Sequence, residues 1–310
     1  MRLLPTNMTP QTSFKTANQL LREGKLDAAI AAYREAIAVN PGFPHAHHNL
    51  GEALVKAGRV DEAVAAFRQA VELNPQAVWS LFKLGELLRG QQRFEEAVGF
   101  LRRAVELKSD AAEFNLGLGA ALVKLGSALE EGSACLLRAV ELNPFLAEAY
   151  YYLGVAASKR QQWSEAVEFY GRGLEVNPSW VECGLGLAEA LGKLGRWSEA
   201  VQKYRQMVLV SGESGEVCFG LGQALGQLGR WEEAVVEYRR AISSGFAGAP
   251  VRHHLGYALG QLGRWDEAVI EFRLVLEINP KSASVRHQLG YALMRLEHWG
   301  EAEIELRRAA

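Results

Sequence analysis

Large side chains recur every 34 or 35 residues along this chain, and they are the residues best suited to bind another molecule. The set comprises Phe14, His48, Phe82, Leu116, Tyr151, Leu185, Phe219, His253 and His287. Rings held at regular intervals on a surface would pack against an extended or helical peptide and act as its anchors. The alternative is structural, with the same residues partly covering a neighbouring helix.

A second set lies four residues after the first. It comprises Asn18, Glu52, Glu86, Ala120, Val155, Glu189, Gln223, Tyr257 and Tyr291. Residues four apart share one face of a helix, so both sets are expected on the same broad face.

Charged residues recur at the ends of the expected helices that carry these two sets. Acids open four of them, at Glu113, Glu148, Glu182 and Glu216, and bases close three, at Lys124, Lys159 and Lys193. The helix dipole favours this arrangement by itself, and the alternative is an acidic rail that prefers basic ligands. Near the end of the chain the sequence predicts a basic cluster for an acidic peptide or phosphate, made of Arg252, His253, His254, Arg286 and His287.

No pattern in the sequence favours catalysis, a cofactor or a metal. Gly220, Gly222 and Gly226 mimic a dinucleotide fingerprint, but that motif requires a preceding strand and a βαβ unit. They are interpreted as packing glycines. His253 and His254 are adjacent and would point in different directions on a helix, and His45, His47 and His48 are interpreted as a polar helix start. We therefore expect no enzyme activity, no cofactor and no metal.

Composition narrows the partners and the location. The chain has 310 residues, and 34 basic against 36 acidic side chains give a formal charge of -2. This balance lacks the global basic field of a nucleic-acid binder. No apolar run approaches the roughly 18 residues that cross a bilayer, and the N-terminus is too short in apolar residues for a signal peptide. Three cysteines form no disulfide framework. The expected location is cytoplasmic, with no nucleic acid and no membrane as partner.

The elements that position these residues follow from an internal repeat. Gly-Arg-Trp motifs at 195, 229 and 263 and five Asn-Pro pairs keep one phase, and each unit reads as two helices, the first stopping at a residue such as Gly58. After a lead-in of residues 1–9, the predicted solenoid covers residues 10–310, with one extra residue near Ser127 in its fourth unit. The predicted units are 10–43, 44–77, 78–111, 112–146, 147–180, 181–214, 215–248, 249–282 and 283–310.

This pattern resembles the tetratricopeptide repeat family over all but the first nine residues. Within each unit the eighth position is Gly or Ala, as at Gly51, the twentieth is small, as at Ala63, and the twenty-fourth is large, as at Phe67. A helical glycine costs about 1 kcal/mol relative to alanine, so small residues in one phase indicate close helix packing. The tryptophans at the seventeenth position, such as Trp231, are interpreted as contacts between repeats, the alternative being a stacking surface for ligands.

The resemblance implies an all-α, right-handed superhelical solenoid of antiparallel helix pairs. It also implies a concave groove lined by the first helix of each unit, through positions 2, 5, 6, 9, 12 and 13. The predicted groove residues are Phe14, Asn18, His48, Asn49, Trp79, Phe82, Lys83, Glu86, Tyr151, Tyr152, Phe219, His253, His254, Tyr257, His287 and Tyr291.

The favoured function is a non-enzymatic scaffold that binds a peptide or protein segment in this groove. Asn18, Asn49 and Lys83 match the family's carboxylate clamp, but Phe14 and Trp79 replace its two lysines, so chaperone-tail binding is not predicted. The alternative function is the N-terminal targeting arm of a larger enzyme, such as a glycosyltransferase or sulfotransferase. Self-association through uncapped solenoid ends is a third hypothesis.

Overall fold

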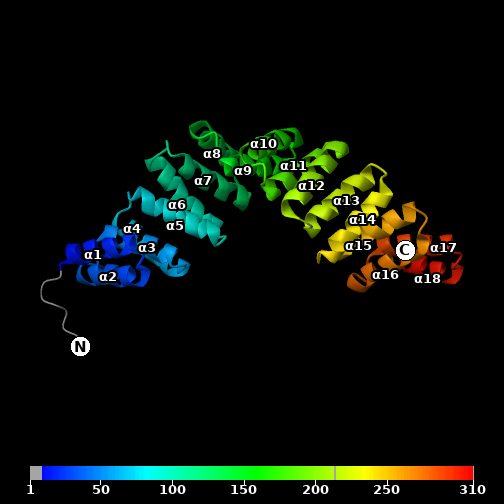
Figure 1. Ribbon diagram of the computed structural model, residues 1–310, viewed down its shortest axis with the longest axis horizontal. Coiled ribbons are helices and arrows are strands. Elements are labelled where there is room, and N and C mark those ends of the chain that lie inside the picture. The colour runs from blue at the N-terminus through cyan, green and yellow to red at the C-terminus, as the bar shows by residue number, and fades with distance from the viewer. Residues whose placement is uncertain (1–8, 213, 310) are drawn as a thin grey trace, which may run out of the picture. The chain divides into compact units, whose positions relative to one another are not determined.

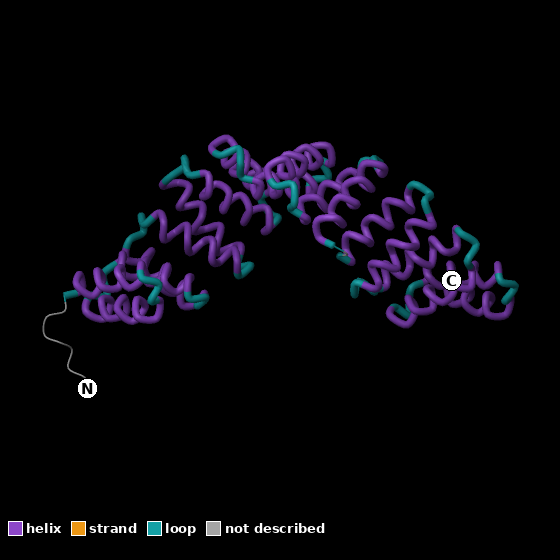
Figure 2. Tube along the Cα trace, viewed as in Figure 1, coloured by secondary structure: helices purple, strands orange, loops and turns teal. Residues whose placement is uncertain are grey.

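The computed structural model describes residues 9–212 and 214–309, and within them every regular element is an α-helix (Figures 1 and 2). The chain divides between Ala156 and Ala157 into two compact units, here called the N-terminal and C-terminal units. The predicted all-α array of helix pairs is confirmed. The predicted lead-in, apart from Thr9, lies outside the described residues.

Helix bounds follow the repeat closely. The first half of the chain forms α1 (Pro10–Arg22), α2 (Leu26–Val39), α3 (Pro44–Lys56), α4 (Val60–Leu73), α5 (Val78–Gly90), α6 (Phe94–Leu107), α7 (Ala112–Leu125), α8 (Leu129–Leu142) and α9 (Ala147–Lys159), which crosses the boundary. The second half forms α10 (Trp163–Val176), α11 (Val181–Lys193), α12 (Trp197–Ser211), α13 (Gly215–Gln227), α14 (Trp231–Ser243), α15 (Ala249–Gln261), α16 (Trp265–Ile278), α17 (Ala283–Arg295) and α18 (Trp299–Ala309).

Odd-numbered helices are the A helices of their repeats and even-numbered helices are the B helices. In the N-terminal unit α1 packs against α2, α2 against α3, and so on through α8, and the same order holds from α10 to α18 in the C-terminal unit (Figure 1). Each helix therefore buries one stripe against its own partner and another against the next repeat.

A left-handed residue ends each A helix at position fifteen of the repeat. In the second repeat this residue is Gly58, with φ at 72°, and the backbone N–H of Arg59 donates to the carbonyl oxygen of Leu54 at 2.9 Å. Such a C-cap favours glycine because a Cβ is strained there. The third, fifth and ninth repeats instead place Gln92, Gln161 and Glu297 in this conformation.

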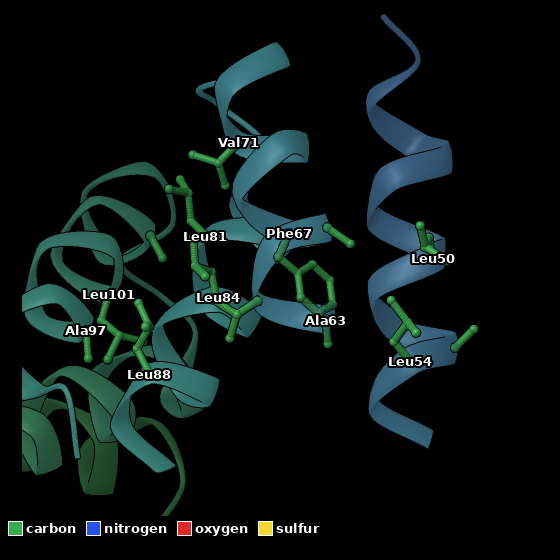
Figure 3. Packing of buried hydrophobic residues seen from close by; sticks show 14 of the residues in the cluster. Leu50, Leu54, Ala63, Phe67, Val71, Leu81, Leu84, Leu88, Ala97 and Leu101 are labelled. Carbon is green, nitrogen blue, oxygen red and sulfur yellow. The ribbon is translucent and has the colours of Figure 1, made fainter. Parts of the chain in front are cut away.

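The predicted contact between small and large residues inside each repeat is confirmed. A Cβ added to Gly51 would lie 2.8 Å from the ring of Phe67, which is fully buried beside Ala63 (Figure 3). In the C-terminal unit a Cβ on Gly222 would lie 2.6 Å from the ring of Tyr238. Glycine therefore sets the distance between the A and B helices of a repeat.

Ion pairs join successive B helices on their exposed side. An arginine at position twenty-five reaches the glutamate at position nineteen of the next repeat, with N–O distances of 2.6–2.9 Å. The pairs are Arg34–Glu62, Arg68–Glu96, Arg102–Glu131, Arg205–Glu233, Arg239–Glu267 and Arg273–Glu301. In the fourth and fifth repeats this position holds Leu137 and Gly171 instead of arginine. We call this series the arginine ladder.

Candidate functional site

The predicted groove residues lie on A helices, on the side here called the A-helix face. In the N-terminal unit their polar groups bind one another. Asn49 donates to the side-chain oxygen of Asn18 at 2.8 Å, and the Tyr33 hydroxyl donates to the same oxygen at 2.6 Å. His48 Nδ1 lies 2.9 Å from Ser80 Oγ, and burial is the main cause that lowers the pKa of His48. These groups are already partnered inside the fold.

Aromatic residues of the same unit also contact one another. The ring centroid of Phe114, a fully buried residue that the sequence analysis did not single out, lies 4.5 Å from that of Phe82 and 5.1 Å from that of Trp79. Phe14 lies 4.9 Å from Phe43 in the same manner. The rings of Phe82 and Phe14 are half-buried, so the structural interpretation of this set holds at least in part. Trp79 is the exception, with 52% of its surface exposed.

An arginine that the sequence analysis missed occupies the A-helix face of the N-terminal unit. Arg89 donates to both carboxylate oxygens of Glu86, at 2.7 and 3.0 Å, and its Nη1 lies 3.5 Å from a carboxylate oxygen of Glu148 and 3.4 Å from the hydroxyl of Tyr152. Only 21% of the Arg89 side chain is exposed. Lys83 similarly lies 3.4 Å from Glu52. The chain thus neutralises its own acids on this surface.

Two tyrosines complete that surface. The rings of Tyr151 and Tyr152 meet edge to face at 5.2 Å, and the ammonium of Lys124 lies 5.9 Å from the ring centroid of Tyr152. Glu148, which the sequence placed on a possible acidic rail, and Lys124 therefore interact with residues of the chain itself.

The A-helix face of the C-terminal unit holds a larger hollow than the N-terminal unit, in which a cavity of about 220 Å³ lies beside His48 and Trp79. A cavity of about 610 Å³ lies among α11 to α15, with Gln288 of α17 at one edge. Its walls carry six aromatic rings, from Trp197, Tyr204, Phe219, Trp231, Tyr238 and Tyr257. We call it the aromatic hollow. Of the predicted groove residues it gathers Phe219, His253, His254 and Tyr257.

Glycines on the A helices create the aromatic hollow. Added Cβ atoms would lie 2.6 Å from the ring of Trp197 at Gly192, 3.2 Å from the ring of Trp231 at Gly226, and 2.6 Å from the ring of Tyr204 at Gly220. Rings that belong to B helices therefore reach through the A-helix layer. Gly222 is a packing glycine as interpreted, whereas Gly220 and Gly226 in addition line the hollow.

Tryptophans make the predicted contacts between repeats, and Trp197, Trp231 and Trp265 also line cavities. Trp231 lies edge to face with Tyr257 of the next repeat at 5.8 Å, and Trp265 lies likewise with Tyr291 at 5.7 Å, so they do join repeats. Trp197 and Trp231 also line the aromatic hollow. Trp265 lines a smaller cavity of about 200 Å³ together with Tyr257, His287 and Tyr291.

Two carboxylates stand at the aromatic hollow without an ion-pair partner among the described residues, those of Glu189 and Glu216. Burial, together with the negative charges of Glu189 and Glu216, raises the pKa of Tyr204 to about 12. Both carboxylates therefore lie near the Tyr204 hydroxyl. Lys193 is the one lysine or arginine among the lining residues.

The predicted basic cluster near the end of the chain is wrong for its arginines. Arg252 donates to Glu271 at 2.9 Å and Arg286 donates to Glu305, both across to the B helix of the same repeat. His253 Nε2 lies 2.6 Å from the side-chain oxygen of Gln288, and burial, helped by the charge of His253, lowers the pKa of His254. Little positive charge is left there for an acidic ligand.

Neither a metal site nor a membrane-spanning helix is found in the described residues. Across residues 9–212 and 214–309, no group of three or more histidine, cysteine or acidic side chains is arranged to hold a metal ion. In the same part of the chain, no helix is both long and apolar enough to cross a membrane.

Comparison with known proteins identifies the kind of repeat. One tetratricopeptide repeat model matches residues 14–78, 82–144 and 185–250, and two further models of that repeat match 147–179 and 249–282. A comparison with curated protein sequences gives no significant match.

Solved structures share the fold at low sequence identity. A tetratricopeptide repeat protein from Parabacteroides merdae is 15% identical with a TM-score of 0.57, covering 81% of this chain and 98% of its own. YrrB, a repeat protein with an unusual peptide-binding site, is 23% identical with a TM-score of 0.53, covering 56% and 88%. MamA from Desulfovibrio magneticus is 21% identical with a TM-score of 0.51, covering 56% and 98%.

Proposed function

Because this chain belongs to the tetratricopeptide repeat family, we propose that it is a protein-interaction scaffold that binds a peptide or protein segment on its A-helix face. The single observation that carries the proposal is the aromatic hollow, whose volume of about 610 Å³ falls in the range of ligand sites. YrrB, which shares the fold, is described as having a peptide-binding site. We propose the same class of ligand for this chain.

The predicted groove residues divide between two roles in this proposal. Phe219, His253, His254 and Tyr257 line the aromatic hollow and serve as the main contacts. Those of the N-terminal unit are largely engaged with one another, and Trp79 is the ring among them with the largest exposed surface. The proposed activity is binding without a chemical step. A cytoplasmic location is supported by three cysteines that remain free thiols.

A titration with a selected peptide tests the proposal. Random dodecapeptides displayed on phage are selected against the full chain, and the tightest one is synthesised and titrated by calorimetry. Phe219→Ala should weaken binding about thirtyfold, because a desolvated aromatic anchor contributes about 2 kcal/mol. Phe145→Ala, which removes a ring that is 80% exposed and is not among the residues that line the hollow, is the control. If Phe219→Ala stays folded and binds as the parent does, the A-helix face is not the binding surface.

A second candidate is self-association through the last repeat. Trp299 occupies the position at which Trp231 and Trp265 are covered by tyrosines of the following repeat, and it is 61% exposed. Together with Met294 and Leu306 it lines a cavity of about 470 Å³. Sedimentation velocity of the parent and of Trp299→Glu tests this candidate: a parent dimer that the substitution dissolves supports it, and a monomeric parent contradicts it.

A further inference from the structure

Two arginines on the A-helix face make contacts with other residues of the chain that show what this face accepts. The first is Arg89, at position twelve of its repeat. It lies between the carboxylates of Glu86 and Glu148, with the Tyr152 hydroxyl beside it. Carboxylates and phenol oxygens match the fork of a guanidinium.

The second is Arg295, at position thirteen of the last repeat. Its guanidinium carbon lies 4.9 Å from the ring centroid of Trp265. A cation over an indole ring is stabilised by the negative charge of the ring face. The tryptophan of position seventeen therefore accepts an arginine from the repeat that follows.

The equivalent positions around the aromatic hollow hold no arginine. Gly192 stands three residues after Glu189, as Arg89 stands three residues after Glu86. Gln227 and Gln261 stand where Arg295 is, opposite Trp197 and Trp231. Within the described residues, no lysine or arginine of the chain lies over either of those two rings.

The residues that line the hollow also carry more unpaired acidic than basic side chains. Glu189 and Glu216 both lie close enough to Tyr204 to act on its hydroxyl, and Lys193 is the only fully basic residue in the lining. Both glutamates are exposed, so a cation that arrives from solvent can reach their carboxylates beside the aromatic rings. Rings and unpaired acids together therefore favour a positively charged occupant.

We infer that the aromatic hollow takes a basic side chain of the bound segment, arginine by preference, at the place where the chain's own arginines are missing. This inference rests on the proposed function, since it names the kind of peptide that the A-helix face binds. The guanidinium lies against Trp197 or Trp231 and pairs with Glu189 and Glu216. Neighbouring residues of the segment contact Phe219 and Tyr257.

The test measures the coupling between a charge on the peptide and the two carboxylates. The tightest phage-selected dodecapeptide is synthesised with its arginine and with citrulline, which keeps the shape and removes the charge. Both are titrated against the full chain, Glu189→Gln/Glu216→Gln and Glu175→Gln/Glu232→Gln. The last variant changes the net charge equally on exposed B-helix residues and is the matched control.

We expect basic residues in excess among the selected peptides. The change from arginine to citrulline should weaken binding at least tenfold with the parent and with the control variant. With Glu189→Gln/Glu216→Gln the two peptides should bind within twofold of each other, because the partner of the charge is gone. The inference is overturned if basic residues are not in excess among the selected peptides. It is also overturned if the change to citrulline weakens binding equally in all three proteins.

Phe219→Ala separates this failure from that of the proposed function. If neutral peptides are selected and Phe219→Ala weakens them, the hollow binds peptides but not a basic side chain. If Phe219→Ala binds every selected peptide as the parent does, the proposed binding surface is itself wrong, and the inference falls with it.

Discussion

The A-helix faces of the two units are built from the same repeat and differ in what fills them. At position twelve the N-terminal unit holds Leu21, Val55, Arg89 and Val123, whereas the three repeats around the aromatic hollow hold Gly192, Gly226 and Gly260, and the fifth and ninth repeats hold Ser158 and Met294. Position six is glycine at Gly186 and Gly220 beside the hollow, but also at Gly117 in the N-terminal unit. The first surface is mostly filled by its own side chains, and the second carries the larger hollow.

This difference shows that the helix packing and the depth of the A-helix face are determined by different positions of the repeat. The contact between Gly51 and Phe67 in one unit matches that between Gly222 and Tyr238 in the other, so the helix pairs have the same packing. Position six faces the B helix of the preceding repeat, as Gly220 does at Tyr204, and position twelve faces the start of its own B helix, as Gly226 does at Trp231. Their side chains vary without changing the architecture, which leaves them free to define a ligand.

The largest effect is expected where the N-terminal surface merges with the core. Phe114→Ala should lower the free energy of unfolding by about 3–5 kcal/mol, because Phe114 is fully buried and both Phe82 and Trp79 pack against it. Urea denaturation measures this. Phe219→Ala should cost clearly less, since that ring faces the hollow. Equal losses would mean that the two aromatic sets play the same role.

Filling the hollow should remove the difference between the units. In Gly226→Leu the new side chain enters the aromatic hollow, and the ring of Trp231, 3.2 Å from the added Cβ, has to move by a few tenths of an ångström. Peptide affinity should fall at least tenfold, about 1.4 kcal/mol. Helicity should be kept, because leucine is a better helix former than glycine. Calorimetry and circular dichroism measure the two effects, and unchanged affinity would show that the hollow is not the binding site.

Removing the chain's own arginine should expose the acids that it neutralises. Arg89→Ala leaves Glu86 and Glu148 without their partner, and we expect a loss of about 1–2 kcal/mol in unfolding free energy, given that the arginine is mostly buried. Arg103→Ala, an exposed arginine without an ion pair in the described structure, is the control. A loss of unfolding free energy in the control as large as in Arg89→Ala would contradict the stabilising role of the Arg89 ion pairs.

The smallest effects are expected on the arginine ladder, which both units share. Arg68→Ala and Arg239→Ala should each shift the urea midpoint less than Arg89→Ala, because exposed pairs contribute little. A hydrogen bond from the ladder residue Arg68, followed by one from Arg93, lowers the pKa of Glu96 below the ordinary value of 4.5, whereas the pKa of Glu267 is lowered first by Arg264 of its own repeat and only last by Arg239. Their stabilisation is therefore present above that pH and is lost as the pH falls through the lowered pKa. A series of urea midpoints from pH 6 to pH 3 should be flatter in Arg68→Ala than in the parent, because Arg68 is the main cause of the lowered pKa of Glu96. An unchanged slope would contradict the assignment.

The sequence was sufficient to predict the architecture because the architecture depends on residue types in one phase. Gly58 ends its helix, Ala63 is fully buried and Phe67 fills the space beside Gly51, as their positions in the repeat indicate. These contacts are local to one repeat, so a period of 34 residues is enough to find them.

The surface chemistry was harder to predict, because its contacts join different repeats. Arg89 and Glu148 are separated by 59 residues, and no spacing rule marks them as a pair. The pairs Arg252–Glu271 and Arg286–Glu305, which removed the expected basic cluster, are different. Both have a separation of 19 residues, a regularity that the sequence already contained. The role of Gly226 could not be predicted, because the residue type does not distinguish a glycine that allows close packing from a glycine that lines a cavity.

The gap in the arginine ladder at Leu137 and Gly171 has a consequence for how the array loses its structure. In a linear array each repeat draws part of its stability from its neighbours, and unfolding spreads as far as that coupling is strong. Ladder pairs link the first four repeats and the last four, whereas Leu137 and Gly171 supply no such link around the fifth. Each ladder pair contributes little alone, but three successive pairs add up within each block. We therefore expect two cooperative blocks, each able to open while the other keeps its amide protons from exchange. A ligand bound to the C-terminal unit would then slow amide hydrogen exchange in that block first, while the other block would continue to open as before.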